Sequence, residues 1–348
     1  MQSRDLAAAR WLSAQLGTDD LAMAPASEDA SFRRYLRVRH RGRSWVLMDA
    51  PPAHEDSRPF VDVARRLAAA GVTVPTVVAA DLDRGFLLLD DLGTTCYLDR
   101  LVDTTADALY RDALVALDRI QAGADGRGLP RYDQARLQAE MALFPDWLLA
   151  RHLGLAIDDD ARGVLERVFG RLTAACLEQP QVFVHRDYHS RNLMVLATGN
   201  PGILDFQDAV VGPVTYDLVS LLRDLYVAWP RPRVERWVAD AHARLAGRDP
   251  SAAGDLATFR RWFDLTGVQR HLKVAGIFAR LWHRDGKARY LADIPLTLEY
   301  LLAVARRHAE LGELVALVDR LDLPRRVARA NALAGVDRNP ATACPPPL

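Results

Sequence analysis

Two polar clusters in the middle of the chain contain the residues best suited to chemistry. They are HRDYHSRN at residues 185–192 and DFQD at residues 205–208, and each follows apolar residues typical of a short strand. Asp187, Asn192 and Asp205 could therefore converge as hard oxygen ligands or bases. Such groups suit Mg²⁺ and a phosphate ester better than a soft metal. The alternative, in which they only cap turns and pair with arginines, is disfavoured because a polar loop between apolar strands is costly without a function.

Three short strands within residues 182–206 should position these clusters. Their sequences are VFVH, LMVL and GILDF, and GNP at residues 199–201 predicts a turn between the last two. The two clusters should therefore be neighbours on a hairpin. Apolar residues at helical spacing follow residue 93 and resume from Tyr216.

The first 92 residues predict a small sheet with one inserted helix. The predicted elements, in order, are strands at 32–40 and 44–48, a helix from Ser57 to Gly71, and strands near 77–80 and 86–89. Alternation in the first strand places Phe32, Leu36 and Val38 on one face, and residues 41–43 turn the chain into the second strand. This arrangement predicts an α+β protein in which the sheet precedes the helices.

The chain length of 348 residues is about twice that of a typical domain, which favours two lobes. We predict a sheet-rich lobe at residues 1–92 and a larger helical lobe at residues 93–335. Residues 336–348 are rich in proline and offer little to bury, so we expect a disordered tail.

Composition restricts the partners. Lys+Arg and Asp+Glu both number 45, so no overall positive charge attracts nucleic acid or an anionic membrane. No apolar run approaches the roughly 18 residues needed to span a bilayer. Cys96, Cys176 and Cys344 are far apart and form no CxxC pair, which fits a reducing cytoplasm. We expect a cytoplasmic monomer.

The two clusters also resemble motifs of a known family. HRDYHSRN is similar to the kinase catalytic loop HRDxxxxN, and DFQD stands where kinases carry DFG. In its small-molecule form the chain resembles the aminoglycoside-phosphotransferase-like kinases over nearly its whole length. The resemblance implies a two-lobed protein-kinase-like fold, ATP and Mg²⁺. Only about a dozen residues separate Asp205 from Asp217, too few for the activation segment that docks a peptide, so we expect a small-molecule acceptor.

The resemblance also implies roles for individual residues. Asp187 would orient or deprotonate the acceptor hydroxyl, while Asn192 and Asp205 would hold Mg²⁺. Asp217 would support the catalytic loop from the following helix, and His185 would be structural.

The nucleotide-binding end departs from the kinase pattern. Met48 occupies the position of the phosphate-binding lysine, Asp62 stands where a glutamate partner is expected, and the turn at residues 25–35 contains no glycine. Positive charge would then come from Arg33, Arg34 or Arg37, since arginine binds phosphate through its fork of donors; alternatively, these arginines only solvate the strand. The residues expected to contact the nucleotide are Ser31, Arg33, Arg34, Met48, Asp90 and Leu92.

Five further stretches resemble the bacterial anomeric amino-sugar kinases. They are SFRRY at 31–35, LMDAP at 47–51, FLLLDDLG at 86–93, GPVTYDLVSLLRD at 212–224 and QRHLKVAGIFARL at 269–281. Enzymes of that family phosphorylate the C1 hydroxyl of N-acetylmuramate and N-acetylglucosamine in cell-wall recycling. The residues considered for sugar contact are Arg223, Asp224, Arg270, His271 and Lys273. The carboxylate of muramate would favour an arginine.

Three alternatives remain open at this point. His185 and His189 are four residues apart, as in some zinc hydrolases, although HExxH would require a glutamate after the first histidine. The missing lysine would also fit a non-catalytic nucleotide-sensing pseudokinase. A kinase for choline, homoserine, thiamine or an aminoglycoside is the third, and Tyr226 and Trp229 could supply an aromatic cage for choline.

Overall fold

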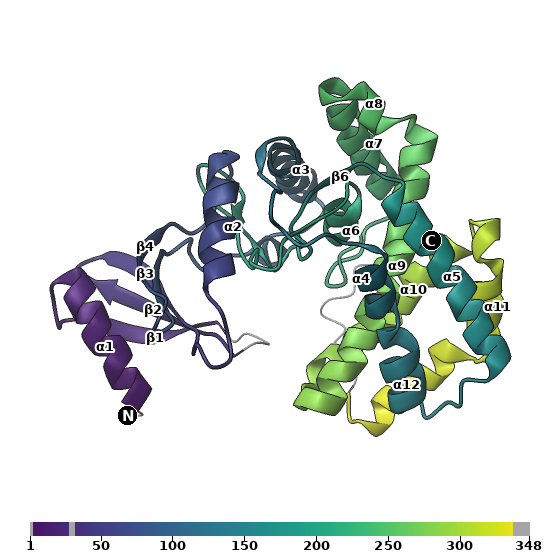
Figure 1. Cartoon of the computed structure of the whole chain (residues 1–348), viewed down its shortest axis with the longest axis horizontal. Helices are drawn as coiled ribbons and strands as arrows, with labels where there is room; N and C mark the ends of the chain where they lie inside the picture. The colour runs from purple at the N-terminus through teal and green to yellow at the C-terminus, as the bar shows by residue number, and fades with distance from the viewer. Residues whose placement is uncertain (1–2, 28–31, 337–348) are drawn as a thin grey trace.

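The computed structural model describes residues 3–27 and 32–336, and it consists of a sheet-rich first part and a helical second part (Figure 1). The predicted α+β order is therefore confirmed. The residues from 337 onward, where a disordered tail was predicted, lie outside the described residues. The division between lobes at residues 92 and 93 stays a prediction.

The first part forms a five-stranded antiparallel sheet in the order β1-β2-β3-β5-β4. Its strands are β1 (Ala22–Ser27), β2 (Arg34–His40), β3 (Arg43–Asp49), β4 (Val77–Asp81) and β5 (Phe86–Asp90). The predicted hairpin is present as β2 and β3, and Arg41 and Gly42 at its turn both have positive φ, at 45° and 76°. Two successive positive φ values match the right-handed twist of a tight hairpin. Helix α2 (Arg58–Ala69) begins directly after Ser57, as predicted.

Helix α1 (Ser3–Leu16) and strand β1 were not predicted from the sequence. One face of α1, formed by Ala8, Trp11 and Leu12, packs on the sheet against Trp45 and Phe86. Burial of each large side chain of this kind contributes about 1.5–3 kcal/mol. Residues 25–27, predicted as the start of the turn at 25–35, belong instead to the end of strand β1. Its sequence, AMAPAS, gives no alternating pattern, and an edge strand tolerates the proline.

The predicted inward orientation of Phe32 is wrong. Its side chain is 66% exposed and stacks on His54 with ring centroids 4.8 Å apart, whereas Val38 is fully buried. Phe32 lies before the first residue of β2, so the alternation of the strand does not extend to it.

The second part is organised around α9, the longest helix among the described residues. The helices of this part are α3 (Ala106–Gly123), α4 (Gln134–Met141), α5 (Asp159–Leu177), α6 (Tyr216–Leu222), α7 (Arg231–Arg248), α8 (Pro250–Ala253), α9 (Leu256–Asp285), α10 (Ile294–Ala305), α11 (Gly312–Arg320) and α12 (Leu323–Leu333). Gly276 lets α9 pass close to the backbone of Leu143, since a Cβ there would lie 2.3 Å from the Leu143 carbonyl carbon. No helix of the described residues is both long enough and apolar enough to cross a bilayer.

Four short strands interrupt the helices. Strand β6 (Gln181–Val184) pairs with β9 (Val210–Pro213), and β7 (Leu193–Met194) pairs with β8 (Gly202–Ile203). The predicted hairpin between the second and third strands is confirmed as β7 and β8. Strand β9 was not predicted, because Gly212 and Pro213 read as a break before the next helix.

A continuous apolar core joins the two parts. It includes Met48 and Leu87 from the sheet, Phe60 from α2, and Tyr110 and Phe206 from the second part. The rings of Phe60 and Phe206 lie 4.8 Å apart. Phe206 belongs to the DFQD cluster, so packing against α2 helps to position that cluster.

Candidate active site

The loop of residues 185–192 leaves the end of β6 and enters β7, so strands hold both of its ends. The carboxylate of Asp217 on α6 accepts hydrogen bonds from the backbone amides of His185 at 2.7 Å and Arg186 at 2.9 Å. Asp217 is fully buried. Its expected supporting role is thereby confirmed.

Asp224, which was considered for sugar contact, also holds this loop. Its Oδ2 accepts a hydrogen bond from the Ser190 amide at 2.9 Å, and its Oδ1 accepts one from the Tyr226 amide at 3.0 Å. Asp224 is buried. The structure therefore assigns it a positioning role, and a contact with sugar stays a prediction.

His185 connects the two clusters from inside the fold. Its Nε2 donates to the Leu204 carbonyl at 2.9 Å, and its Nδ1 accepts from the Asp187 amide at 3.2 Å. Burial lowers the pKa of His185 to about 4, so the ring is neutral and can accept at Nδ1. Because both ring nitrogens are engaged, the zinc-ligand alternative loses its first histidine, and the expected structural role is confirmed.

Asp187, Asn192 and Asp205 lie together, as predicted. Asn192 Nδ2 donates to the Asp187 carbonyl at 2.9 Å and lies 3.3 Å from Asp205 Oδ2. Gln207 Nε2 donates to Asp205 Oδ1 at 2.8 Å. Arg186 and Asp205 have positive φ, at 80° and 61°. Non-glycine residues adopt this conformation at a cost of about 1–3 kcal/mol, and such residues cluster at functional sites.

This donor set fits the magnesium ion that the resemblance implies. Because Nδ2 makes both contacts, Asn192 Oδ1 is left as a neutral oxygen ligand on a side chain next to the carboxylate of Asp205. Mg²⁺ in phosphate-transferring enzymes is typically held by one or two carboxylates together with substrate phosphates and water.

A partly buried charge network joins the loop to α4 and α9. Glu140 Oε1 pairs with Arg186 Nη2 at 2.6 Å, and Glu140 Oε2 pairs with Lys273 Nζ at 3.1 Å. Lys273 also donates to the Tyr216 hydroxyl at 3.0 Å, and the Tyr132 hydroxyl bonds to Glu140. Lys273 was considered for sugar contact, but its ammonium group binds Glu140 and Tyr216 of this network instead.

The network affects the charge of the proposed base. Burial raises the pKa of Asp187, but the positive charges of Lys273, Arg270 and Arg186 more than offset this effect and hold that pKa below its ordinary value. Asp187 is therefore an anion at neutral pH.

The nucleotide candidates on β2 and β3 divide between the two faces of the sheet. Met48 is fully buried in the apolar core and contributes no charge. Arg34 lies on the opposite face, where it donates to Asp49 at 3.0 Å and to Asp5 at 2.9 Å. The structure thus gives Arg34 a role in attaching α1 to the sheet.

Arg33 lies directly before the first residue of β2. Its Nη2 donates to Glu55 Oε2 at 3.1 Å. Burial lowers the pKa of Arg33, but the charges of Tyr35, Glu55 and Asp205 raise it above the ordinary value overall. The charge of Asp205 contributes to this rise in pKa, so the electrostatic influence of the proposed metal site extends to Arg33.

Glu55 is a partner that the sequence analysis missed. Asp62, the expected acidic partner, instead pairs with Arg66 at 2.8 Å on the exposed side of α2. Glu55 precedes α2 and meets Arg33 only through the fold, so no local spacing signals the pair.

The other nucleotide candidates lie around the connection between the two parts. Asp90 is exposed at the end of β5, and Leu92 lies close to Gly202 of β8, where a Cβ would approach the Leu92 side chain to 2.8 Å. Arg37 fixes this connection by donating to Asp91 at 2.7 Å. Ser31 lies outside the described residues.

The remaining sugar candidates are buried in the second part. The Arg223 guanidinium pairs with Asp264 and covers the Phe263 ring at 4.2 Å. His271 stacks on Tyr300 with ring centroids 5.3 Å apart. Arg270 Nη1 is buried and has no hydrogen-bond partner within the described part of the chain. Their contacts with sugar stay predictions.

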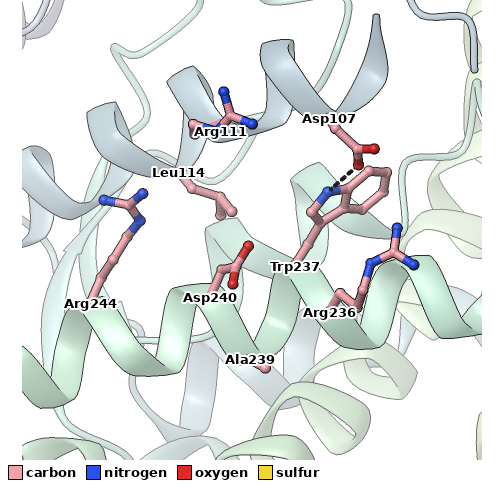
Figure 2. A pocket seen from close by; sticks show the side chains of 8 residues that line it. All are labelled: Asp107, Arg111, Leu114, Arg236, Trp237, Ala239, Asp240 and Arg244. Atoms are coloured by element: carbon pink, nitrogen blue, oxygen red, sulfur yellow. Dashed lines mark hydrogen bonds between the residues drawn. The ribbon is translucent and has the colours of Figure 1, made fainter. Parts of the chain in front are cut away.

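A separate cavity of about 380 Å³ lies between α3 and α7 (Figure 2). Its lining includes Arg111, Arg236 and Arg244, and its wall contains a hydrogen bond of 3.0 Å from Trp237 Nε1 to Asp107. None of its lining residues comes from the two polar clusters. The candidate active site is therefore defined by the loop rather than by this cavity.

Comparison with known proteins agrees with this geometry. Residues 22–256 match the model of a family described as the phosphotransferase enzyme family. An N-acetylmuramate/N-acetylglucosamine kinase from Pseudomonas aeruginosa is 53% identical over 297 residues, which is 84% of this chain and 88% of that protein. A protein of the same name from Neisseria meningitidis is 42% identical over 329 residues, covering 91% of this chain and 96% of the relative.

Solved structures share the fold at low sequence identity. A choline/ethanolamine kinase family protein from Mesorhizobium loti superposes with a TM-score of 0.60 at 16% identity, covering 90% of this chain and 99% of that one. An ADP-bound aminoglycoside phosphotransferase gives a TM-score of 0.57 at 14% identity, covering 85% and 97%. The expected two-lobed kinase-like fold is thus confirmed.

Proposed function

The chain belongs to the phosphotransferase enzyme family and is a kinase, and on this premise we propose that it phosphorylates N-acetylmuramate, N-acetylglucosamine or both with ATP, at the anomeric C1 hydroxyl. The proposed product would enter the recycling of cell-wall sugars. The observation that carries the proposal is the convergence of Asp187, Asn192 and Asp205. It occurs in a chain whose relatives, similar over most of its length, are named as kinases of these two sugars.

Asp187 is the proposed base. It is half-buried and anionic, and the loop that carries it is fixed by the buried carboxylates of Asp217 and Asp224. A fixed carboxylate can accept the proton of the acceptor hydroxyl and orient its oxygen toward the phosphoryl group. This positioning is the main contribution that a kinase makes to phosphoryl transfer.

Asn192 Oδ1 and Asp205 would hold magnesium, and Arg33 would contact the nucleotide phosphates. A bound magnesium ion would neutralise charge on the phosphates. The pair of Arg33 and Glu55 would then replace the lysine–glutamate pair of kinases that carry a lysine at the position of Met48. The presence of both metal-binding residues favours a catalytic protein over a pseudokinase.

The surroundings of Tyr226 disfavour choline and aminoglycosides as acceptors. The guanidinium of Arg191 covers the Tyr226 ring at 3.7 Å, so a protein cation occupies the face that a choline cation would need. Trp229 is buried in the core, where its Nε1 donates to the Tyr110 hydroxyl at 2.9 Å. A positive charge at this position would repel cationic acceptors.

Replacement of Arg33 by alanine should raise the KM for ATP roughly tenfold, since a charge-assisted hydrogen bond contributes about 1.5 kcal/mol or more. The matched control is Arg34→Ala, the next residue along the chain, whose partner is Asp49 rather than Glu55; it should lower stability through loss of the Asp49 pair but leave the KM for ATP within about twofold. Steady-state kinetics with ATP as the varied substrate measures both values. An unchanged KM in Arg33→Ala would remove this arginine from the phosphate site.

The proposed acceptor class is tested by ADP release from the purified protein with ATP and Mg²⁺. N-acetylmuramate and N-acetylglucosamine should support turnover, while choline, homoserine, thiamine and an aminoglycoside should not. Preferential turnover of any of the latter group would overturn the amino-sugar assignment and leave the kinase assignment intact.

A further inference from the structure

The catalytic loop contains two arginines whose environments differ. Arg186 is half-buried and paired with Glu140 at 2.6 Å. Arg191 is exposed and forms neither a hydrogen bond nor an ion pair with any residue that the structure describes, although it lies next to the proposed metal ligand Asn192. An unpaired arginine on such a loop has its full set of donors available for a ligand.

The guanidinium of Arg191 packs over the ring of Tyr226. Its guanidinium carbon lies 3.7 Å from the centre of the Tyr226 ring, and the amide of Tyr226 is in turn held by Asp224. A planar guanidinium that stacks on a ring directs its N–H groups outward along its edge. This arrangement prepares the fork of donors that binds a carboxylate through two parallel hydrogen bonds.

His189 connects Arg191 with the proposed base. Its ring packs edge-on against Tyr226 with centroids 5.4 Å apart, and its amide donates to the carbonyl of Asp187 at 3.0 Å. His189 Nδ1 is buried and has no hydrogen-bond partner among the residues described. His189 and Arg191 therefore both contact the Tyr226 ring, and the backbone of His189 is bonded to that of Asp187.

Other polar atoms without protein partners lie on this loop and on α9. Within residues 3–27 and 32–336 they include Ser190 Oγ, Arg270 Nη1 and both side-chain polar atoms of Gln269. Buried polar groups generally have hydrogen-bond partners, and a polar ligand is one source of them. The charge of Arg270 also acts on Asp187 and His189.

We propose that Arg191, which packs over the Tyr226 ring, binds the carboxylate of an acidic amino-sugar acceptor and so favours N-acetylmuramate over the neutral N-acetylglucosamine. This assignment rests on the proposed function and adds a residue that distinguishes the two sugars. A bidentate arginine–carboxylate pair supplies orientation as well as affinity, so the acidic sugar gains a second fixed point besides its reacting hydroxyl.

The test compares the two sugars in the same protein preparation. Arg191→Gln should lower kcat/KM for N-acetylmuramate by about 10- to 100-fold, mainly through KM, and change kcat/KM for N-acetylglucosamine by less than about threefold. Arg191→Lys retains the charge without the fork and should give an intermediate loss. The ratio of the two sugars is independent of the folded fraction, so a change in stability cannot produce the expected result.

Arg43→Gln is the matched control, because Arg43 is also exposed and covers an aromatic ring, that of Trp45 at 5.1 Å, but lies in the hairpin of the first part. It should leave the ratio unchanged. Equal losses for both sugars in Arg191→Gln, an increased KM for ATP, an unchanged ratio, or the same shift in Arg43→Gln would each overturn the assignment. Failure of the proposed function would be evident separately, as absence of turnover of both sugars by the unaltered protein.

Discussion

Asp187→Asn should retain the fold and lose about 10²- to 10⁴-fold in kcat, the range typical when a catalytic acid or base is removed. Asparagine has nearly the same shape, so the amide contacts of the loop backbone are preserved, including the hydrogen bonds that Asp217 accepts from His185 and Arg186. The acceptor hydroxyl, however, would lose the carboxylate that receives its proton. ADP release under saturating ATP and sugar measures the loss.

A suitable control for this variant is Asp62→Asn on the exposed side of α2, where Arg66 is the ion-pair partner of the carboxylate among the residues that the structure describes. Surface ion pairs contribute about 0–1 kcal/mol, so its turnover should stay within about twofold of the unaltered protein. Retention of more than half of the activity in Asp187→Asn would remove Asp187 from its role as base.

Asp205 and Asn192 should differ in the severity of their metal defects. Asn192→Ala removes a neutral oxygen, and we expect a magnesium requirement on the order of 10- to 100-fold higher. Removal of the Asp205 carboxylate should be more severe, because a charged ligand is lost from a site that binds a divalent cation and phosphates. Turnover measured as a function of magnesium concentration distinguishes the two.

The backbone at Asp205 requires a careful choice of substitution. Its φ of 61° is unfavourable for alanine, so Asp205→Ala would combine loss of charge with backbone strain. Asparagine tolerates this conformation, and Asp205→Asn therefore isolates the effect of the charge. The same magnesium dependence in Asp205→Asn and the unaltered protein would contradict the assignment.

The sequence predicted the order of elements where a regular pattern exists and failed where it does not. Strands β2 and β3 alternate and join at a glycine-containing turn, and α2 has clear helical spacing and a positive-φ glycine, Gly71, beyond its end. The edge strand β1 is composed of small residues with a proline, and β9 contains Gly212 and Pro213. Their strand conformation comes from pairing with β2 and β6, which local pattern does not encode.

In the candidate site, too, local sequence patterns indicated some residues, whereas tertiary contacts determine the roles of others. Asp187, Asn192 and Asp205 could be found from sequence because they lie in two short polar clusters beside strands. Arg34 pairs with Asp49 directly across the β2–β3 hairpin, whereas the ion pair of Lys273 with Glu140 joins segments far apart in the chain. No spacing indicates such pairs, so a list of polar residues on suitable helices and strands cannot separate residues that support the site from residues that face a substrate.

The chemistry of the product tests the central proposal most directly. The C1 hydroxyl of an amino sugar belongs to a hemiacetal, and once it is phosphorylated the ring can no longer open to the aldehyde. Incubation of the protein with N-acetylmuramate or N-acetylglucosamine, ATP and Mg²⁺ should therefore consume reducing ends in a one-to-one ratio with ADP release, and mild acid should restore them. A phosphorylated product that is still reducing would place the phosphate on another hydroxyl and contradict anomeric phosphorylation.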